Sequence, residues 1–359
     1  MSDTPLISIC IPAYNRAALL PALLDSIVSQ SGVNYEIVIC EDASPEREQI
    51  REVAEQYATA YPSQLSYHEN KVNLGYDGNL RRLVELARGE YVLFMGNDDL
   101  LAKGALAAVA AAVRVHADVG VVLRSYDSFY DDPERPVQIF RYFDSESFFP
   151  AGTQTIVTFF RRCVFISGMV VRRASAHRHS TNRFDGTLLY QQHLVGQILA
   201  NENGVYLPQI LSHHRLGGTP DFGNSVAEQG RFVPREQTPE SSVHFMCGML
   251  RIASDLEQTL GLPVYMPITK DIGNYSYPIL SIQADRSIGE FLLYLWQIAK
   301  LGFWKVPMFY IYACGLLMLR RSTCDRIIAS LKRIKGRAPV LGNVYAGHAR
   351  NQTGDKGKD

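Results

Sequence analysis

The chain has 359 residues, of which 47% are hydrophobic and 20% are charged, a composition typical of a folded globular protein that excludes a largely disordered one. Its 36 basic residues balance its 36 acidic residues, and no nucleic-acid-binding motif is present, so nucleic acid is excluded as an expected partner.

The six cysteines and the N-terminal sequence both bear on location. The cysteines are scattered, several lie within apolar runs, and they form neither a CxxC pair nor a cluster with histidine at zinc spacing. The first sixteen residues lack a basic segment followed by a long apolar one, so no secretory signal is predicted. We therefore expect reduced core cysteines in a cytoplasmic protein.

The first third of the chain alternates apolar runs with helical patterns. The apolar runs are LISICIP (6–12), YEIVICED (35–42), LSYHEN (65–70) and YVLFM (91–95), and the intervening helices cover about 17–30, 46–61 and 77–88. Nearly continuous apolar strands separated by helices of this length indicate βαβ units. The predicted class is α/β, with a mostly parallel sheet covered by helices on both faces.

Polar residues follow three of these strands directly, as PAYNR (12–16), EDAS (41–44) and GNDD (96–99). Loops at the carboxyl ends of parallel strands gather at one edge of a sheet, where ligands bind, so we expect one shared cleft. The adjacent carboxylates of Asp98 and Asp99 need a further explanation. A helix cap ahead of LLAKGALAAVAAAV accounts for one aspartate but not for both.

The rest of the chain changes character from about residue 119. We expect a loop-rich, aromatic insertion at 119–152 that includes a strand, then a strand at 165–173, a helix at 188–200, a strand at 204–215, and mostly helices after Asn224. The corresponding domains are a first domain at 1–224, with halves 1–118 and 119–224, a helical accessory region at 225–340, and a disordered tail at 341–359.

Three segments together resemble a known family. In order and spacing, ISICIPAYNRAALLPALLDSI, YEIVICEDASPE and NKVNLGYDGNLRRLVELARGEYVLFMGNDDLL resemble the N-terminal half of family 2 glycosyltransferases, which are inverting enzymes of the GT-A fold. The likeness covers about residues 6–110 and extends more loosely to about 217. CEDAS with GNDDLL is similar to bacterial O-antigen sugar transferases such as the abequosyltransferases.

The resemblance implies a GT-A (Rossmann-like) fold for residues 1–224, which would be divided into a donor half and an acceptor half. It also implies transfer of a sugar from a nucleotide-sugar donor to a glycan or lipid-linked oligosaccharide, in the synthesis of O-antigen or another cell-surface polysaccharide.

The resemblance also implies a metal site, because a hard cation held by carboxylates would neutralise charge on the departing nucleoside diphosphate. The family motif is usually DxD, and here Gly96 stands at its first position and Asp98 at its last. We expect Asp98 to be the principal ligand of Mn²⁺ or Mg²⁺, and Asp99 to be a second ligand, a water-mediated contact or the helix cap. His213 or His214 would complete the shell, but only one of them, since neighbours on a strand face opposite sides. Arg215 would pair with phosphate.

The other implied donor contacts come from the same loops. Pro12, Ala13 and Tyr14 would border the nucleoside, Glu41 and Asp42 would bind the base, Asn73, Gly75 and Asn79 would shape the pocket, and Asn97 would act beside Asp98. Simpler structural interpretations stay open: Pro12 can mark a strand exit, Asp42 can cap the helix that begins near Pro45, and Gly75 can be a turn residue.

Inverting transfer needs a base for the acceptor hydroxyl. Where relatives carry an acidic pair, this chain has Gln191 and Gln192, which leaves the adjacent His193 or Asp185 as candidates. A non-catalytic sugar-binding or scaffold protein is one alternative. A nucleotidyltransferase is another, but it would need a glycine-rich, basic loop after the first strand, which PAYNR is not.

The segment LGFWKVPMFYIYACGLLMLRR is the most apolar part of the chain. Its uncharged stretch, 306–319, is shorter than the ~20 residues of a membrane-spanning helix, and Pro307 interrupts its start. Basic residues are concentrated between Lys300 and Arg337. Residues from about 290 to 337 therefore suit helices lying on the inner face of an anionic membrane, and equally a core or oligomer interface of an accessory domain.

Overall fold

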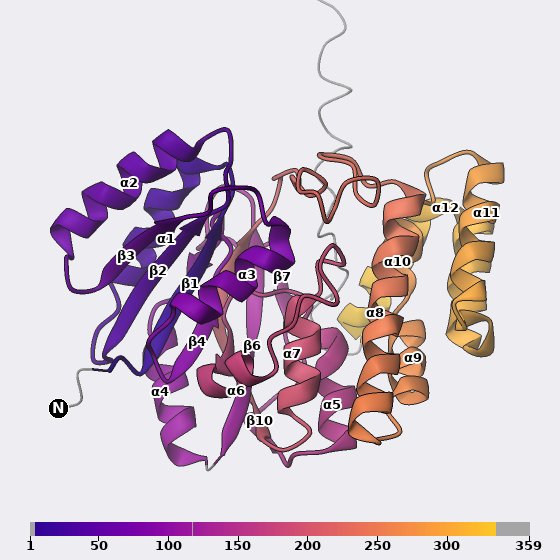
Figure 1. Cartoon of the computed structure of the whole chain (residues 1–359). Helices are drawn as coiled ribbons and strands as arrows, with labels where there is room; N and C mark the ends of the chain where they lie inside the picture. Colours follow the sequence, from indigo (N-terminus) through magenta and orange to yellow (C-terminus); the bar gives the residue numbers. More distant parts are fainter. Residues whose placement is uncertain (1–3, 117, 335–359) are drawn as a thin grey trace, which may run out of the picture.

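A computed structural model describes residues 4–116 and 118–334 (Figure 1). The strands are β1 (Ile7–Ala13), β2 (Tyr35–Glu41), β3 (Leu65–Glu69), β4 (Tyr91–Phe94), β5 (Leu100–Leu101), β6 (Val119–Phe129), β7 (Gln138–Phe140), β8 (Ser147–Phe149), β9 (Met169–Arg172) and β10 (Asn203–Arg215). The helices of the sheet region are η1 (Ala17–Leu19), α1 (Leu20–Val28), α2 (Arg47–Ala60), α3 (Gly75–Leu86), α4 (Ala105–Val115), α5 (Thr153–Phe160), η2 (Arg161–Cys163), α6 (Arg173–Arg178) and α7 (Tyr190–Ile198). The later helices are α8 (Pro239–Leu260), α9 (Tyr265–Asn274), α10 (Tyr277–Ser281), α11 (Ile288–Lys300), η3 (Phe303–Lys305) and α12 (Pro307–Ile334).

All of the strands belong to one sheet of order β3-β2-β1-β4-β9-β6-β10-β5, with β7 added to β6 and β8 to β10. Strands β3, β2, β1 and β4 are parallel, β9 is antiparallel to both of its neighbours, and β6 and β10 are parallel to each other. The carboxyl ends of β1, β2 and β4 therefore lie at the same edge of the sheet. The predicted α/β class is confirmed.

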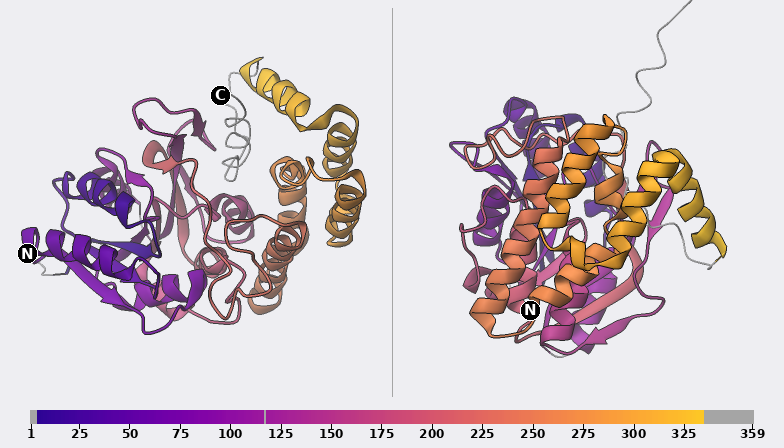
Figure 2. Two further views of the ribbon diagram at one scale, coloured as in Figure 1. Left: turned by 90° about the horizontal axis from the view of Figure 1, so that it is seen from above. Right: turned by 90° about the vertical axis from the view of Figure 1, so that its right-hand side faces the viewer.

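Alternation along the strands builds one core on each face of the sheet. In β1, Ile9 packs with α1, α2 and α4, whereas its neighbour Cys10 packs with α3 and the helices beyond it. Helices α8 to α12 form an outer layer on the second face, at the opposite side of the molecule from α2 (Figures 1 and 2).

One element boundary differs from its prediction in a way that affects the site. The helix after Asp99 begins only at Ala105, with Gly104 at its N-cap, because Leu100 and Leu101 pair with β10 as strand β5. Asp99 is therefore not the cap of a helix, and its burial needs another cause.

The C-terminal part consists mostly of helices, the first of which begins at Pro239, in agreement with the mostly helical region expected after Asn224. Within residues 4–116 and 118–334, no helix combines the length and hydropathy required to cross a bilayer. The predicted disordered tail, 341–359, and the last residues of the predicted accessory region and basic segment lie outside the described residues.

Candidate active site

The three predicted loops lie side by side at the carboxyl ends of β1, β2 and β4, and the region between them is called the cleft below. The side-chain amide of Asn97 donates to the carbonyl oxygen of Asn15 at 2.9 Å, and Arg16 forms an ion pair with Asp98. On the other side of β1, the backbone N–H of Asp42 donates to the carbonyl oxygen of Ala13 at 3.0 Å. The structure thus brings the three loops together, and ligand binding between them stays a prediction.

Asp99 anchors this end of the cleft. Its side chain is buried and accepts hydrogen bonds from the hydroxyl of Ser167, from the backbone N–H of Arg215 at 3.0 Å and from Nδ1–H of His214 at 3.0 Å. Burial alone would lower the pKa of His214, but the carboxylates of Asp99 and Asp98 raise it. Both oxygens of Asp99 are thus engaged, and the residue orients β10 and its histidine.

Asp98 is more accessible, with 15% of its side chain exposed, and it pairs with Arg16. Burial and the adjacent Asp99 raise the pKa of Asp98, while Arg16 and His214 offset part of this rise. Arg215 lies alongside: its Nε–H donates to the carbonyl oxygen of Asp98 at 3.2 Å. The corner is therefore a carboxylate surrounded by cationic groups.

The donor set at this corner fits a divalent cation with two protein ligands. The bond from His214 Nδ1–H to Asp99 leaves Nε2 as the nitrogen that can bind a metal, which is the usual way a carboxylate orients a metal-binding histidine. Among the described residues, no three histidine, cysteine or acidic side chains form a ready metal cluster. Asp98 and His214 would therefore hold the ion together with phosphate oxygens and water. His213 contacts Asp127 at 2.8 Å, so of the two neighbouring histidines only His214 contacts the Asp98–Asp99 corner, and its role as a metal ligand stays a prediction.

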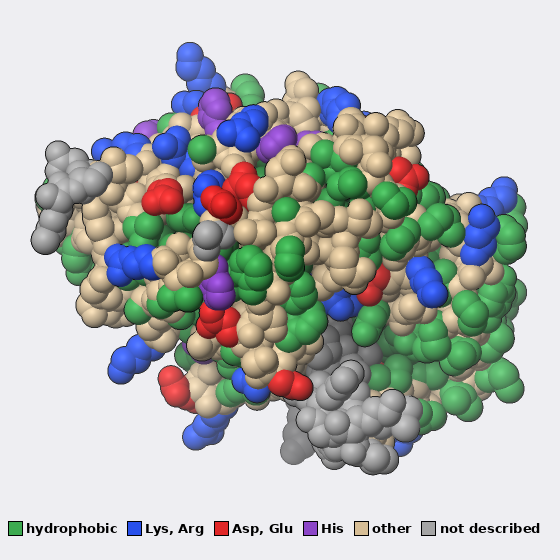
Figure 3. Space-filling view, turned by 90° about the horizontal axis from the view of Figure 1, so that it is seen from below, with side chains coloured by type: hydrophobic (Ala, Val, Ile, Leu, Met, Phe, Trp, Pro, Cys, Tyr) green, Lys and Arg blue, Asp and Glu red, His purple; other side chains and the backbone are tan. Residues whose placement is uncertain are grey.

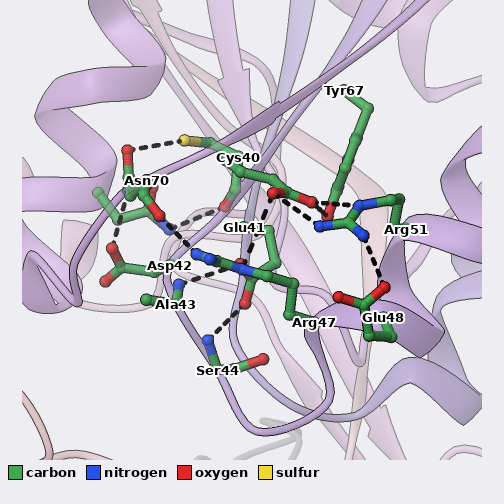
Figure 4. Close-up of polar contacts among 12 residues, drawn as sticks. Cys40, Glu41, Asp42, Ala43, Ser44, Arg47, Glu48, Arg51, Tyr67 and Asn70 are labelled. Carbon is green, nitrogen blue, oxygen red and sulfur yellow. Dashed lines mark hydrogen bonds and ion pairs between the residues drawn. The ribbon is translucent and has the colours of Figure 1, made fainter.

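Glu41 stabilises the second loop (Figure 4). Its buried carboxylate accepts from the backbone N–H groups of Ala43 and Ser44, at 3.0 and 2.6 Å, and from Arg47 Nε at 2.6 Å. These donors occupy both oxygens. The geometry therefore favours a structural role for Glu41 over the predicted contact with a base.

Asp42 lies deeper in the cleft than expected. It does not cap α2, which begins at Arg47; instead its Oδ1 accepts from Asn70 and from the backbone N–H of Leu74, and its Oδ2 accepts from the N–H of Gly75 at 2.9 Å. Burial raises the pKa of Asp42 to about 6 in spite of these donors. A carboxylate oxygen can accept two hydrogen bonds, so Oδ2 keeps one free position for a ring N–H.

The predicted pocket residues around Asp42 have distinct places. Asn79 is buried behind the loop, where it donates to the carbonyl oxygen of Cys40 at 3.0 Å and accepts from Asn70. Asn73 accepts from the N–H of Gly75 at 2.9 Å. Tyr14 hydrogen-bonds to Asn73, and burial, followed by the charges of Asp221 and Asp42, raises its pKa.

A segment that sequence reasoning missed lies over this cleft. Residues 216–237, here called the covering loop, reach the first strand loop through Thr219, whose carbonyl oxygen accepts from Arg16 at 2.9 Å, and through Asp221, which accepts from Asn15 at 3.2 Å. Its Glu228 accepts from the backbone N–H of Tyr76 at 2.8 Å. The loop lacks regular secondary structure and apolar periodicity, so its sequence gave no signal. Arg16 was likewise missed, although it stands within PAYNR.

The two predicted bases have other hydrogen-bond partners than the Asp98 corner. His193 is buried on α7, with Nε2 3.2 Å from the carbonyl oxygen of His179 and its ring against Phe184, and burial lowers its pKa to about 4. The carboxylate of Asp185 forms a bidentate pair with Arg81, at 2.6 and 2.8 Å, and its carbonyl oxygen accepts from Arg231 of the covering loop at 3.0 Å.

A second missed residue, Asp77, organises the approach to α7. Its buried carboxylate accepts from the backbone N–H groups of Gly186, Thr187, Leu188 and Tyr190. No sequence pattern indicates this role, because an aspartate in the first turn of a helix is ordinary. Gln191 and Gln192, where relatives carry acids, donate to backbone carbonyl oxygens of the preceding segment.

The sheet order and the cleft at its switch from parallel to antiparallel strands define a GT-A fold. The chain is similar to TarS 1–349 from S. aureus, with a TM-score of 0.58 and 15% identity over 92% of each chain. It also resembles the same protein solved with UDP-GlcNAc, with a TM-score of 0.55 and 16% identity over 92% of each chain. At this identity the likeness establishes the fold.

Residues 8–180 match the model described as Glycosyl transferase family 2, so this part of the chain belongs to that family, as the sequence predicted. It is 39% identical over 114 residues to abequosyltransferase RfbV from Salmonella typhimurium, which covers 32% of this chain and 34% of that protein. It is 28% identical over 178 residues to the putative glycosyltransferase EpsE from Bacillus subtilis, which covers 50% of this chain and 60% of that protein. The matched segment therefore spans about a third of RfbV and less than two thirds of EpsE.

Proposed function

We propose that this protein is a metal-dependent, inverting glycosyltransferase that moves one sugar from a nucleotide-sugar donor to a glycan or lipid-linked oligosaccharide, in the synthesis of O-antigen or another cell-surface polysaccharide. The observation that carries the proposal is the cleft itself. In a family 2 domain, one end holds Asp42 with a free acceptor position, and the other holds Asp98 among Arg16, His214 and Arg215. Likeness to an abequosyltransferase supports the O-antigen assignment.

The two ends of the cleft suit two parts of a nucleotide sugar, the base and the diphosphate. At the Asp42 end, Oδ2 accepts a ring N–H of the base, and Tyr14 borders the nucleoside. At the Asp98 end, Arg16 and Arg215 bind phosphate oxygens, which guanidinium groups suit well. The Arg16 guanidinium pairs with Asp98 and is held at the position where the diphosphate of the donor would lie.

Mn²⁺ or Mg²⁺, when bound, neutralises charge on the leaving diphosphate. Asp98 and His214 would be its protein ligands, with Asp99 orienting His214 through Nδ1–H. Inverting transfer is one displacement: the acceptor oxygen bonds to the anomeric carbon as the bond from that carbon to phosphate oxygen breaks, and a base removes the hydroxyl proton. Of the two predicted bases, Asp185 has 23% of its side chain exposed and would have to release Arg81, whereas His193 is buried.

The test is donor binding with metal. We expect at least one of UDP, GDP, CDP and dTDP, with Mn²⁺, to raise the melting temperature, because a ligand well above its Kd stabilises the folded state by a few kcal/mol. Asp98→Asn should abolish the Mn²⁺-dependent part of this rise, while Asp132→Asn, an exposed carboxylate outside the cleft, should leave it unchanged. A wild type that none of these nucleotides stabilises would contradict the proposal, and so would an Asp98→Asn variant that responds like wild type.

We also propose that helices α11 and α12 place the enzyme on the inner face of an anionic membrane, as a cytoplasmic, peripheral protein whose accessory region begins near residue 225. Leu292, Leu293 and Trp296 lie on the exposed side of α11, opposite its buried residues. Figure 3 shows hydrophobic side chains gathered on this side of the molecule. The outer apolar face consists of Ile288, Leu292, Leu293, Trp296, Trp304, Tyr310, Ile311, Leu317, Met318 and Leu319. Lysines accompany it, with Lys300 3.6 Å above the ring of Trp296.

A further inference from the structure

A cavity of about 260 Å³ lies outside the donor cleft, between the covering loop and helices α8, α9 and α10. The loop contributes Phe222, Phe232 and Val233, and the helices contribute Met249, Ile272 and Ile279. Most of its wall is therefore aliphatic or aromatic. A concave, mainly apolar pocket with a few polar groups is the usual form of a small-molecule site.

The covering loop is a shared wall between this cavity and the donor cleft. Phe222 lines the cavity and packs edge to face on Tyr76, with the ring centroids 5.6 Å apart. The residue before it, Asp221, accepts from Asn15 in the cleft at 3.2 Å. The covering loop therefore contacts the cavity through Phe222 and the donor cleft through Asp221.

The polar groups of the cavity wall favour a ligand with a negatively charged end. Arg161 lines the cavity and shares the single carboxylate of Asp271 with Arg162, at 2.9 and 3.6 Å, so one positive charge is left over. The Arg161 guanidinium also lies 3.8 Å from the ring centroid of Tyr275, another wall residue. Glu236 in the wall is balanced by Arg286 at 3.6 Å.

Apolar walls and an excess positive charge together match an amphiphile that has a hydrocarbon chain and an anionic head.

We propose that this cavity binds the lipid portion of the acceptor: the hydrocarbon chain of an anionic, phosphate-bearing lipid packs against Phe222, Met249 and Ile279, and its head lies near Arg161. The inference rests on the proposed function, because it assigns the cavity to the second substrate of that reaction. It also gives the covering loop two contacts, one with each substrate.

The experiment uses the full chain and farnesyl phosphate below its aggregation concentration, titrated by calorimetry. Farnesol, which lacks the phosphate, tests how much the charge contributes to binding. Inorganic phosphate, which lacks the hydrocarbon, tests how much the chain contributes. The blocking variant is Val233→Trp, at an exposed wall position where a larger side chain can be accommodated, and the charge variant is Arg161→Gln. Matched controls are Val226→Trp, which is 87% exposed on the same loop, and Arg135→Gln, a fully exposed arginine elsewhere.

We expect farnesyl phosphate to bind wild type about tenfold more tightly than farnesol, and inorganic phosphate not to bind measurably, because a charged hydrogen bond contributes about one to two powers of ten in affinity. Val233→Trp and Arg161→Gln should each weaken farnesyl phosphate about tenfold, and both controls should bind like wild type. Equal binding by Val233→Trp and wild type would overturn the location, and equal binding of farnesol and farnesyl phosphate would overturn the charge assignment.

Nucleotide binding with Mn²⁺, measured on the same samples, separates this inference from the proposed function. Nucleotide binding without farnesyl phosphate binding overturns the lipid site and leaves the glycosyltransferase assignment standing. Farnesyl phosphate binding without any nucleotide binding overturns the proposed function and, with it, the assignment of the lipid to an acceptor.

Discussion

Asp98 and Asp99 are neighbours in the chain, yet their carboxylates have opposite surroundings. Asp99 is 2% exposed and accepts from Ser167, His214 and the backbone N–H of Arg215. Asp98 faces the cleft and has Arg16 as its ion-pair partner. Asp99 therefore holds neighbouring groups of the site in place, while Asp98 is positioned to contact a ligand.

This difference predicts different responses to the same substitution. Asp99→Asn should lower the free energy of unfolding by about 1–3 kcal/mol, because its amide replaces an acceptor with a donor among buried donors. Asp98→Asn should change it by less than about 1 kcal/mol, because the pair that it breaks is partly exposed. Urea unfolding of both variants measures this, and equal destabilisation would show that Asp99 has no special anchoring role.

His193 predicts a pH dependence of stability. Burial lowers its pKa to about 4 in the folded protein, against about 6.5 in an unfolded chain, so protonation favours unfolding. The stability contributed by neutral His193 is complete above pH ~6.5 and is lost as pH falls toward ~4, by about 3 kcal/mol over the window. Urea unfolding of His193→Gln between pH 4 and 7.5 should show a free energy of unfolding that lacks this loss at low pH, and the variant should still bind nucleotide. A variant with the same pH dependence as wild type would show that His193 is not its source.

At the scale of elements, Gly75 joins α3 to the covering loop. Its φ is +78°, and a Cβ there would lie 2.4 Å from Ser225 Oγ and 2.8 Å from Glu228 Oε1. Gly104, at the start of α4, has nearly the same φ, +76°, but no atom within 4 Å of the corresponding position. The two glycines therefore separate backbone strain from contact with the loop.

Gly104→Ala should cost about 1–2 kcal/mol, the left-handed penalty alone, whereas Gly75→Ala should cost more and loosen the covering loop. Urea unfolding measures the loss of stability in each variant. Loosening of the covering loop is measured by tryptic cleavage after Arg231 and Arg235 under native conditions, which should be faster in Gly75→Ala only. Adding Ser225→Gly to Gly75→Ala should recover part of the loss. Equal costs at the two glycines, with unchanged cleavage, would show that the loop does not rest on Gly75.

The sequence predicted the strands and their polar exits well, because apolar runs and turn residues are local signals. The short strand β5 was missed, since Leu100 and Leu101 form it only by pairing with Ser212 and His213, far along the chain. The partners of the carboxylates were missed for the same reason. Asp77 binds the backbone of residues 186–190, and no spacing within NLGYDGN indicates those partners.

At the scale of the whole molecule, periodicity predicted a mostly parallel α/β sheet and the family resemblance implied its GT-A form, but neither predicted how the helices pack on its second face. The position of α8 to α12 depends on side-chain packing between distant elements, such as Gly196 on α7 against Leu256 on α8, which no local pattern encodes. The apolar residues of α11 and α12 divide accordingly: one side joins the core and the other stays exposed. The core interpretation therefore holds for the buried side, and membrane contact of the exposed side stays a prediction.

Tryptophan fluorescence can report whether the exposed side of α11 and α12 docks on a membrane. Both tryptophans of the chain, Trp296 and Trp304, lie on the outer apolar face and are 54% and 56% exposed. If this face docks on an anionic membrane, vesicles that contain an anionic phospholipid should shift the tryptophan emission to the blue, since the indoles leave water for the lipid interface. Salt should weaken the effect by screening Lys300 and Lys305, and zwitterionic vesicles should give a smaller shift.

The double variant Leu292→Glu, Ile311→Glu keeps both probes and places two carboxylates on the face, so it should abolish the shift. Val115→Glu, which introduces the same change at an exposed apolar residue on α4, should keep it. An unchanged shift in the double variant would mean that the tryptophans report some other event. No shift in wild type would assign the face to a protein partner or a second copy of this chain, because an apolar surface of this size seldom stays uncovered.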